Sequence, residues 1–317
     1  MSPTTIFAPA STPAQLIFSL SSLVIGVVIA IFVVVASLLA YALIRFRRRP
    51  DDDRSEPPQV YGSNRVELAW TVIPILIVVA LFLGSARVIT SVENDPQANA
   101  TTIVAVGHQF WWEYRYPSLG VVTANELHLP VSGPGRPSRT LIALLSADTD
   151  HSFWIPRLGG KTDLIPNRIN TMWLDPTETG LFLGQCAQYC GTQHARMLLR
   201  VYVDTPDAFE RWIREQREPA RQDDNFDAAE GRRIFLRTSC VNCHAVSGTV
   251  AAGRFGPDLT HLMSRDTIAA GVVPNTVDNL RAWIRDPEVF KPGSRMPAMQ
   301  LSDRELNEVT AYLATLR

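Results

Sequence analysis

The sequence of 317 residues is poor in several features that point to common classes of protein. Its formal net charge is only −1, which argues against nucleic acid as a partner, because nucleic-acid-binding proteins present a basic surface. Residues 1–15 contain no lysine or arginine, so the positively charged start of a cleaved signal peptide is missing. There are only four cysteines, and all fall into two short patterns typical of metal binding, so no thiol is left over.

Charge is also missing from two long windows, Leu16–Ile44 and Leu68–Ala86. A bilayer core about 30 Å thick is crossed by roughly 20 apolar residues in a helix, and both windows are long enough. A buried helix of a soluble protein is the alternative, but such helices are seldom so long and apolar. We therefore predict membrane spans at about 16–44 and 68–88, with Pro74 as a kink that a membrane helix tolerates.

The segment between the two predicted spans is rich in arginine. Cation-rich loops stay in the cytoplasm, so both termini are expected on the outer, periplasmic side of a bacterial inner membrane. Everything after about residue 90 would then lie in an oxidising compartment, where a leftover thiol is at risk of oxidation. The arginines are Arg45, Arg47, Arg48, Arg49, Arg54 and Arg65.

Short apolar, aromatic or β-branched runs, separated by Pro, Gly, Asn and Asp, follow the predicted spans. Such spacing favours a β-sandwich or a Greek-key barrel. The runs are Thr101–Tyr116, Arg139–Ala147, Asn170–Leu174, Gly180–Cys186 and Met197–Val203.

The chain after the β-rich runs is predicted to be helical. Thr205 and Pro206 have the residue types of an N-cap and a first helical position, and predict a helix to about Arg217. A polar, proline-containing linker then leads to a small all-α domain. The predicted organisation is an N-terminal segment with the hairpin over 1–95, a β-rich domain over 96–217, a linker over 218–225 and a helical domain over 226–317.

The first cysteine pattern joins Cys186 and Cys190 to His194 and Met197 within one loop, with His151 upstream. Thiolate, imidazole and thioether ligands together suit copper better than zinc, which seldom recruits methionine. A disulfide between the two cysteines is the alternative, but it would leave both histidines and the methionine without a role.

Two thiolates at this spacing can bridge a pair of copper ions. Each ion then needs one imidazole, which His151 and His194 supply. Each also needs a weak axial ligand, which Met197 and the backbone carbonyl of Gln188 can supply. A bridged pair changes little in shape on reduction, and this small reorganisation makes electron transfer fast.

The second pattern, Cys240-Val-Asn-Cys243-His244, is the attachment signature of haem c. Cys240 and Cys243 would form the thioether bonds, and His244 would bind the iron. A thioredoxin-like thiol pair is the alternative, but the βαβ context it requires is missing from the surrounding sequence. Amphipathic helices are predicted on either side, over Asp227–Arg237 and, beginning with a capping box, over Ser302–Leu316.

This helical region resembles a small monohaem cytochrome c, which implies a methionine as the sixth iron ligand. Related cytochromes place that methionine directly before a proline, so we predict Met296, with Met299 as the alternative. Met263 is too close to His244 in sequence to reach the opposite face of the haem. The resemblance also implies a hydrogen bond from Trp283 to a haem propionate, with plain core packing as the alternative.

The segment from His151 to Met197 resembles the CuA domain of cytochrome c oxidase subunit II. The likeness extends to the Gly-His-Gln-Phe-Trp-Trp run at residues 107–112, to the Gly-Gly-Lys-Thr-Asp run at 159–163, and to Glu67–Pro74 in the hairpin. It covers roughly residues 16–215. It implies a cupredoxin-like barrel on a two-helix membrane anchor, docked on subunit I, the large haem-copper subunit, among the other oxidase subunits.

The resemblance also implies roles for single residues. Glu67 would lie at the mouth of a proton path into the large subunit, with an ordinary interfacial carboxylate as the alternative. Trp111 and Trp112 would lie on an electron path to copper, with simple packing of a buried aromatic strand as the alternative. Many members have Glu in place of Gln188, where it helps to hold magnesium; the neutral amide is a weaker ligand, so firm magnesium binding is not expected.

Two redox patterns on one anchored chain predict subunit II of a caa-type cytochrome c oxidase, with its cytochrome c fused on. Electrons would come from a cytochrome c or a quinol–cytochrome c reductase to the haem, pass to the copper pair and leave for the large subunit. Dioxygen reduction and proton pumping would take place there, and not in this chain. The alternative is a membrane-anchored periplasmic copper chaperone or thiol reductase, which would need no haem.

Overall fold

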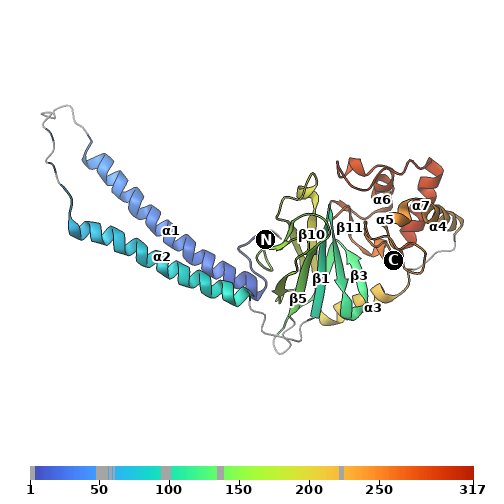
Figure 1. The fold of residues 1–317 in the computed structure, drawn as a ribbon, viewed down its shortest axis with the longest axis horizontal. Coiled ribbons are helices and arrows are strands. Elements are labelled where there is room, and N and C mark those ends of the chain that lie inside the picture. Colours follow the sequence, from blue (N-terminus) through green and yellow to red (C-terminus); the bar gives the residue numbers. More distant parts are fainter. Residues whose placement is uncertain are drawn as a thin grey trace. The chain divides into compact units, whose positions relative to one another are not determined.

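The computed structural model describes residues 4–47, 56, 59, 61–93, 101–133, 139–220 and 225–317. The chain forms two compact units, of which one is Leu16–Asn94 and the other joins Met1–Gln15 to Asp95–Arg317. Half of the predicted linker, residues 221–224, lies outside the described residues. Figure 1 shows the helices and strands in chain order.

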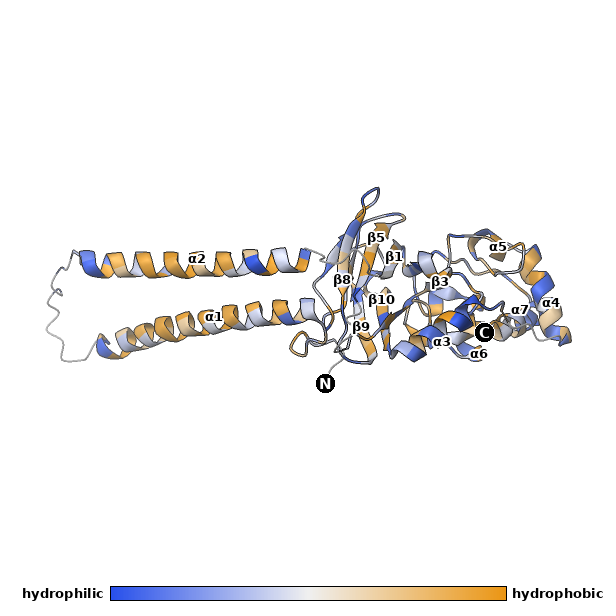
Figure 2. Ribbon diagram, turned by 90° about the horizontal axis from the view of Figure 1, so that it is seen from below, coloured by the Kyte–Doolittle hydropathy of each residue, from blue (hydrophilic) through white to orange (hydrophobic). Residues whose placement is uncertain are grey.

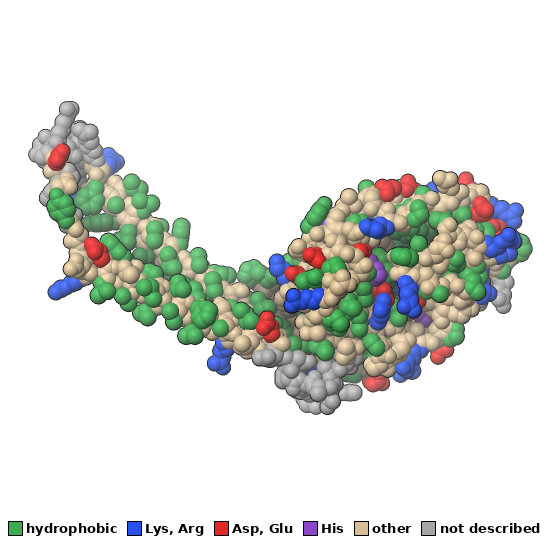
Figure 3. All heavy atoms as spheres, in the orientation of Figure 1, with side chains coloured by type: hydrophobic (Ala, Val, Ile, Leu, Met, Phe, Trp, Pro, Cys, Tyr) green, Lys and Arg blue, Asp and Glu red, His purple; other side chains and the backbone are tan. Residues whose placement is uncertain are grey.

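The membrane-type helices are α1 (Thr12–Arg45) and α2 (Asn64–Glu93), and both are long and apolar enough to cross a bilayer. Helix α1 begins four residues before the predicted span of 16–44 and ends one residue after it, and α2 extends the span of 68–88 by four residues at the start and five at the end. Figure 2 shows hydrophobic residues along both helices, and Figure 3 shows apolar side chains on their surfaces. Helix α2 continues through Pro74. Among the arginines used for orientation, Arg48, Arg49 and Arg54 lie outside the described residues.

The first residues of the chain belong to the same compact unit as the β-rich domain. The backbone N–H and hydroxyl of Thr12 donate to the carboxylate of Asp175 over 2.7 and 2.6 Å. Ala10 adds two backbone bonds: its N–H donates to the carbonyl of Arg157, and its carbonyl accepts from Thr177, both at 2.8 Å. The start of α1 is therefore capped by a residue of the β-rich domain.

The β-rich domain consists of two five-stranded sheets, in the orders β3-β2-β1-β5-β8 and β4-β10-β9-β6-β7. Strand β1 runs parallel to β5, and β4 runs parallel to β10, while the other pairs are antiparallel. This arrangement confirms the predicted cupredoxin-like domain. The strands are β1 (Thr101–His108), β2 (Trp111–Tyr116), β3 (Val121–Ala124), β4 (Glu126–Pro130), β5 (Thr140–Ser146), β6 (His151–Trp154), β7 (Thr162–Leu164), β8 (Asn170–Leu174), β9 (Gly180–Cys186) and β10 (Leu198–Asp204).

The core between the sheets is aromatic. Trp112, Tyr114, Tyr116, Phe153 and Phe182 are all buried, and one apolar cluster joins residues of both sheets. Strands β5 and β10 alternate between buried and partly exposed residues, as expected for strands that cover a core on one face. The run predicted over 101–116 is two antiparallel strands, because the chain reverses at residues 109–110.

The third helix, α3 (Pro206–Arg217), follows the last strand as predicted. The side chain of Thr205 accepts a hydrogen bond from the backbone N–H of Ala208, which confirms the N-cap. Phe209 of this helix is buried in the core of the β-rich domain, so α3 is part of that domain.

The helical domain contains α4 (Phe226–Arg237), α5 (Cys240–Cys243), α6 (Val277–Arg285) and α7 (Asp303–Thr315), with a short hairpin of β11 (Thr267–Ile268) and β12 (Val273–Pro274). Helices α4 and α7 cross closely at Gly231, where a Cβ atom would lie 1.8 Å from the carbonyl oxygen of Glu308. The predicted capping box at Ser302 and Glu305 is confirmed.

Candidate copper and haem centres

The copper-type residues come together because neighbouring strands carry them. Strands β6 and β9 are antiparallel, with Phe153 opposite Cys186, so His151 at the start of β6 lies beside the end of β9. The backbone N–H of Cys186 donates to the carbonyl of Met197 over 3.0 Å. This bond closes the loop of residues 187–196 against the sheet.

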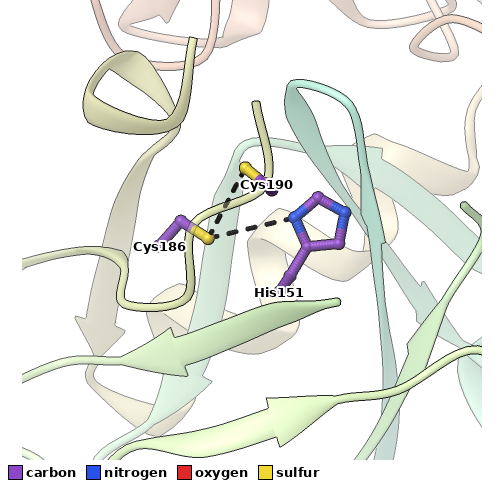
Figure 4. Close-up of side chains that lie close together, drawn as sticks. All are labelled: His151, Cys186 and Cys190. Carbon is purple, nitrogen blue, oxygen red and sulfur yellow. Dashed lines mark hydrogen bonds between the residues drawn. The ribbon is translucent and has the colours of Figure 1, made fainter. Parts of the chain in front are cut away.

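Two thiols and two imidazoles face one another around this loop. The sulfur atoms of Cys186 and Cys190 lie 4.0 Å apart, and both thiols are free and buried. The Nδ1 atom of His151 lies 3.9 Å from the sulfur of Cys186, as Figure 4 shows. On the other side, the Nδ1 atom of His194 lies 3.8 Å from the sulfur of Cys190. Each cysteine therefore has its own histidine.

The two weaker donors are divided in the same way. The sulfur of Met197, which is fully buried, lies 3.9 Å from the sulfur of Cys190. The carbonyl of Gln188 accepts a hydrogen bond from the Cys186 thiol over 3.2 Å. The structure thus brings all six residues of the predicted copper site together.

The contact between the two thiols shifts their pKa values in opposite directions. Hydrogen bonding to Cys190 lowers the pKa of Cys186 well below its usual range; burial opposes this effect, and His151 adds to it. The same contact, together with burial, raises the pKa of Cys190. Because a cysteine binds a metal as thiolate, the lowered pKa favours Cys186 as the first of the two to lose its proton.

A second set of contacts holds the ligands in place. Burial alone would lower the pKa of His151, but Asp148, whose carboxylate lies 2.8 Å from Nε2, and Cys186 raise it overall. The backbone N–H of Gln109 donates to the same carboxylate over 2.7 Å, and the Gln109 amide donates to the carbonyl of Cys190. Gly107 leaves room for the imidazole, because a Cβ atom there would lie 2.8 Å from its Cδ2.

The haem pattern opens onto a cavity of about 660 Å³. Its lining is mostly apolar, and residues 108–111 and 147–148 of the β-rich domain complete the wall. On the helical side the lining includes Cys240, Cys243, His244, Phe235, Leu280 and Trp283.

The backbone around His244 orients its ring. The Nδ1 atom donates to the carbonyl of Pro257 over 2.7 Å, which leaves Nε2 free to bind iron. Burial lowers the pKa of His244 and so favours the neutral ligand form. A Cβ atom on Gly256 would lie 2.6 Å from the imidazole, so this position requires glycine.

Both candidate axial methionines, Met296 and Met299, line the cavity, and Met263 packs instead against the core of the helical domain. The order of preference between Met296 and Met299 therefore remains a prediction from the proline that follows Met296.

The two tryptophans of β2 serve different surroundings, because consecutive strand residues face opposite sides. Trp111 lines the haem cavity and stacks on His108 at 4.2 Å between ring centroids. Trp112 is fully buried and meets the ring of His151 edge-on at 6.0 Å. One ring thus borders the haem cavity and the next borders a copper-type ligand. Glu67, the remaining predicted residue, lies exposed in the first turn of α2.

Sequence reasoning missed two residues of these centres. Asp148 precedes His151 by three positions, and that acidic residue beside a ligand was a usable signal. No pattern in the sequence around Arg265 predicts a role in the haem site. This arginine is buried and lines the haem cavity, with one nitrogen donating to the carbonyl of Asp258 over 2.6 Å. Its Nε has no partner among the described residues.

Three family models match the chain in order. They are cytochrome c oxidase subunit II, transmembrane domain, over residues 3–88; its periplasmic domain over 125–203; and cytochrome c over 228–317. Cytochrome c oxidase subunit 2 of Alkalihalophilus pseudofirmus is 35% identical, over 99% of this chain and 91% of the relative. The chain belongs to the cytochrome c oxidase subunit 2 family.

A second relative agrees with this membership, and a solved structure is similar to part of the chain. Cytochrome c oxidase subunit 2 of Bacillus subtilis is 32% identical, over 87% of this chain and 82% of the relative. Among solved structures, the periplasmic domain of subunit II of cytochrome oxidase of Bradyrhizobium japonicum is 31% identical, covering 38% of this chain and 95% of that chain with a TM-score of 0.35.

The matched models confirm the predicted order of membrane hairpin, copper domain (the β-rich domain above) and cytochrome domain (the helical domain above). The chain is therefore a membrane-anchored electron-transfer subunit of an oxidoreductase complex. Its cofactors are copper and haem c, and its partners are the large subunit and the other subunits of a haem-copper oxidase.

Proposed function

We propose that this subunit passes electrons from a covalent haem c to a dinuclear copper centre, CuA, and on to the large subunit, which reduces dioxygen to water and pumps protons. The division of the copper ligands carries the proposal. His151 and the Gln188 carbonyl lie at Cys186, while His194 and Met197 lie at Cys190. Two metal ions that shared both sulfurs would each find one imidazole and one weaker ligand.

A thiolate-bridged copper pair would supply one-electron transfer with little change in geometry. The chain's own part is to keep the ligands still. The pairing of β6 with β9 fixes His151 against Cys186, and Asp148 holds the imidazole from behind. Burial of the sulfurs keeps water away from the site.

The cavity in the cytochrome domain fits haem c. Cys240 and Cys243 would hold the ring covalently, and His244 and Met296 would bind the iron from opposite faces. The unpartnered Nε of Arg265 is a buried donor in the cavity wall. Because a buried donor without a partner is costly, we assign it to a haem propionate, which adds a site residue to the predicted set.

Trp111 and Trp112 form the proposed electron path between the two centres. Their adjacency in β2 joins the wall of the haem cavity to the ring of His151. Trp112 also belongs to the apolar core, so packing and electron transfer are both served by this residue.

The sidedness of the membrane follows the same proposal. Because Ala10 and Thr12 contact the copper domain, the N-terminus and both redox domains lie on one side of the membrane, which we take to be periplasmic from the arginines between the spans. The external donor, a cytochrome c or a quinol–cytochrome c reductase, would reduce the haem. Glu67 would lie at the opposite, cytoplasmic side near a proton path, and Gln188 disfavours magnesium.

Metal analysis and paramagnetic resonance of the purified oxidase test the proposal. We expect one covalent haem on this chain and a copper signal from one unpaired electron shared by two nuclei. A signal from a single isolated copper would overturn the dinuclear assignment. A reactive thiol pair without copper would favour the chaperone or thiol reductase instead.

A further inference from the structure

A buried carboxylate of the copper domain reaches into the cytochrome domain. Glu126 of β4 is only 4% exposed. It accepts hydrogen bonds from the backbone N–H groups of Asp266 and Thr267 over 3.1 and 3.0 Å, and from the Thr267 hydroxyl over 2.9 Å. Arg200 lies 3.7 Å away and supplies a positive charge. The carboxylate therefore accepts hydrogen bonds from two successive backbone N–H groups at the start of β11, as an acidic side chain does at the N-terminus of a helix.

A buried cation makes the reverse contact. Lys291 of the cytochrome domain is also only 4% exposed, and its ammonium donates to the carbonyl of Phe110 over 2.8 Å. Phe110 lies in the turn between β1 and β2. Burial lowers the pKa of Lys291 to about 7. The lysine is thus desolvated on the copper domain, in the wall of the haem cavity.

Trp111 lies in the sequence between Phe110, the partner of Lys291, and Glu126. It forms a small apolar cluster with Ala124 and with Ala270 of the cytochrome domain. Around it, the backbone N–H of Leu198 donates to the carbonyl of Ala270 over 3.3 Å. Further crossing bonds come from Gln193 to the carbonyl of Pro292, from Arg196 to that of Phe290, and from Arg295 to the side chain of Gln109.

Buried charges restrict the ways in which two surfaces can meet. Removing a carboxylate or an ammonium from water is unfavourable unless hydrogen bonds replace the lost water. Among the described residues, Glu126 accepts hydrogen bonds from Asp266 and Thr267, and the ammonium of Lys291 donates to Phe110. A shifted arrangement would break these hydrogen bonds and leave Glu126 with Arg200 alone, so these two residues favour one register between the domains.

We propose that Glu126 and Lys291 form a clamp that holds the cytochrome domain in one fixed position on the copper domain, with the haem cavity against Trp111. The two side chains are positioning residues. The clamp stands on the contacts alone, while its effect on electron transfer rests on the proposed function.

Lysine labelling of the purified full-length protein tests the clamp directly. The chain has only two lysines, so exposed Lys161 is an internal standard for acylation, followed by mass spectrometry. We expect slow labelling of Lys291 in the unaltered protein. Glu126→Leu should speed it by roughly tenfold or more, since two backbone N–H groups lose a charged partner, and Glu126→Gln should restore part of the protection.

Gln216→Ala is the matched control, because the bond from Gln216 to Ser264 also joins the two domains but is exposed. It should leave the labelling of Lys291 unchanged. Equal labelling of Lys161 and Lys291 in the unaltered protein, or no response to Glu126→Leu, would overturn the clamp. If Glu126→Leu does not fold, Lys291→Met replaces it. Amide hydrogen exchange at Asp266 and Thr267 should then be faster than in the unaltered protein. Unchanged exchange would overturn the clamp.

Internal electron transfer, measured after photoreduction of the haem, connects the clamp to function. Glu126→Leu should slow transfer to copper by roughly tenfold or more while the haem and copper spectra stay unchanged, since it loosens the docked arrangement. Unchanged rates alongside increased labelling would refute the positioning role. Loss of the dinuclear copper assignment would refute the proposed function and leave the labelling result intact.

Discussion

The copper and haem centres differ in how completely the folded chain places their ligands before a cofactor binds. At the copper site, paired strands and a closed loop bring six donors together, and further hydrogen bonds hold them. At the haem site, His244 is oriented but the opposite ligand is one of two methionines in a segment without regular structure. The register of paired strands determines which side chains lie beside one another. A cavity between short helices instead leaves space that its occupant must fill. The predictions below test this contrast.

Cys186→Ser should have the largest effect, because it removes one of the two shared sulfurs. We expect complete loss of the dinuclear copper signal in paramagnetic resonance, with covalent haem c still attached to the chain. Cys240→Ser is the counterpart and should impair haem attachment while leaving copper in place. Loss of both centres in either variant would mean that the two sites do not assemble independently.

Met296→Leu should change the haem from low-spin to high-spin and lower its reduction potential, because the thioether ligand is lost. Met299→Leu is the control and should leave both properties unchanged. Optical spectra and a redox titration measure the outcome. The opposite pattern would assign the ligand to Met299.

Asp148→Asn should weaken copper binding by roughly 10- to 100-fold, as is common when the partner of a metal-binding histidine is altered. The imidazole of His151 would lose its charged partner at Nε2 but keep its place in β6. Competition with a copper chelator measures the change. Asp150→Asn, two residues along, is the control, and an equal effect there would indicate a general charge effect.

Glu113 should make the copper domain sensitive to acid. Burial would raise the pKa of Glu113, but hydrogen bonds from His108 and Arg115 outweigh it and lower the pKa from 4.5 to about 2. The stabilisation is therefore complete above pH 4.5 and is lost as the pH falls towards 2, in total on the order of 2–3 kcal/mol. Denaturant titrations of the metal-free protein should show this loss, and Glu113→Gln should remove most of it.

Ser302→Ala should have the smallest effect, about 1 kcal/mol of stability in the cytochrome domain, because the capping box of α7 loses its hydroxyl. Thermal unfolding of the haem-loaded protein measures it. The copper spectrum should not change, and a change there would show that α7 also supports the copper domain.

Local patterns predicted more of this molecule than long-range contacts did. The ends of β8 and β9 and the caps of α3 and α7 follow from residue types within a few positions. The short strands β3, β4, β6 and β7 were missed, because their pairing depends on distant partners. The copper ligands were predictable because the chemistry requires particular side chains, whereas Arg265 and Glu126 have roles that only the folded chain reveals.

The cap on α1 has a consequence for the order of events during synthesis. Asp175 follows Thr12 by 163 positions, so the hairpin is complete before its capping residue exists. The backbone N–H of Thr12 must rely on water until the copper domain folds, whereas that of Ala14 already has the hydroxyl of Ser11 as its partner. Folding of the copper domain therefore completes the cap of α1, and a variant that delays this folding leaves the Thr12 amide without its protein partner for longer.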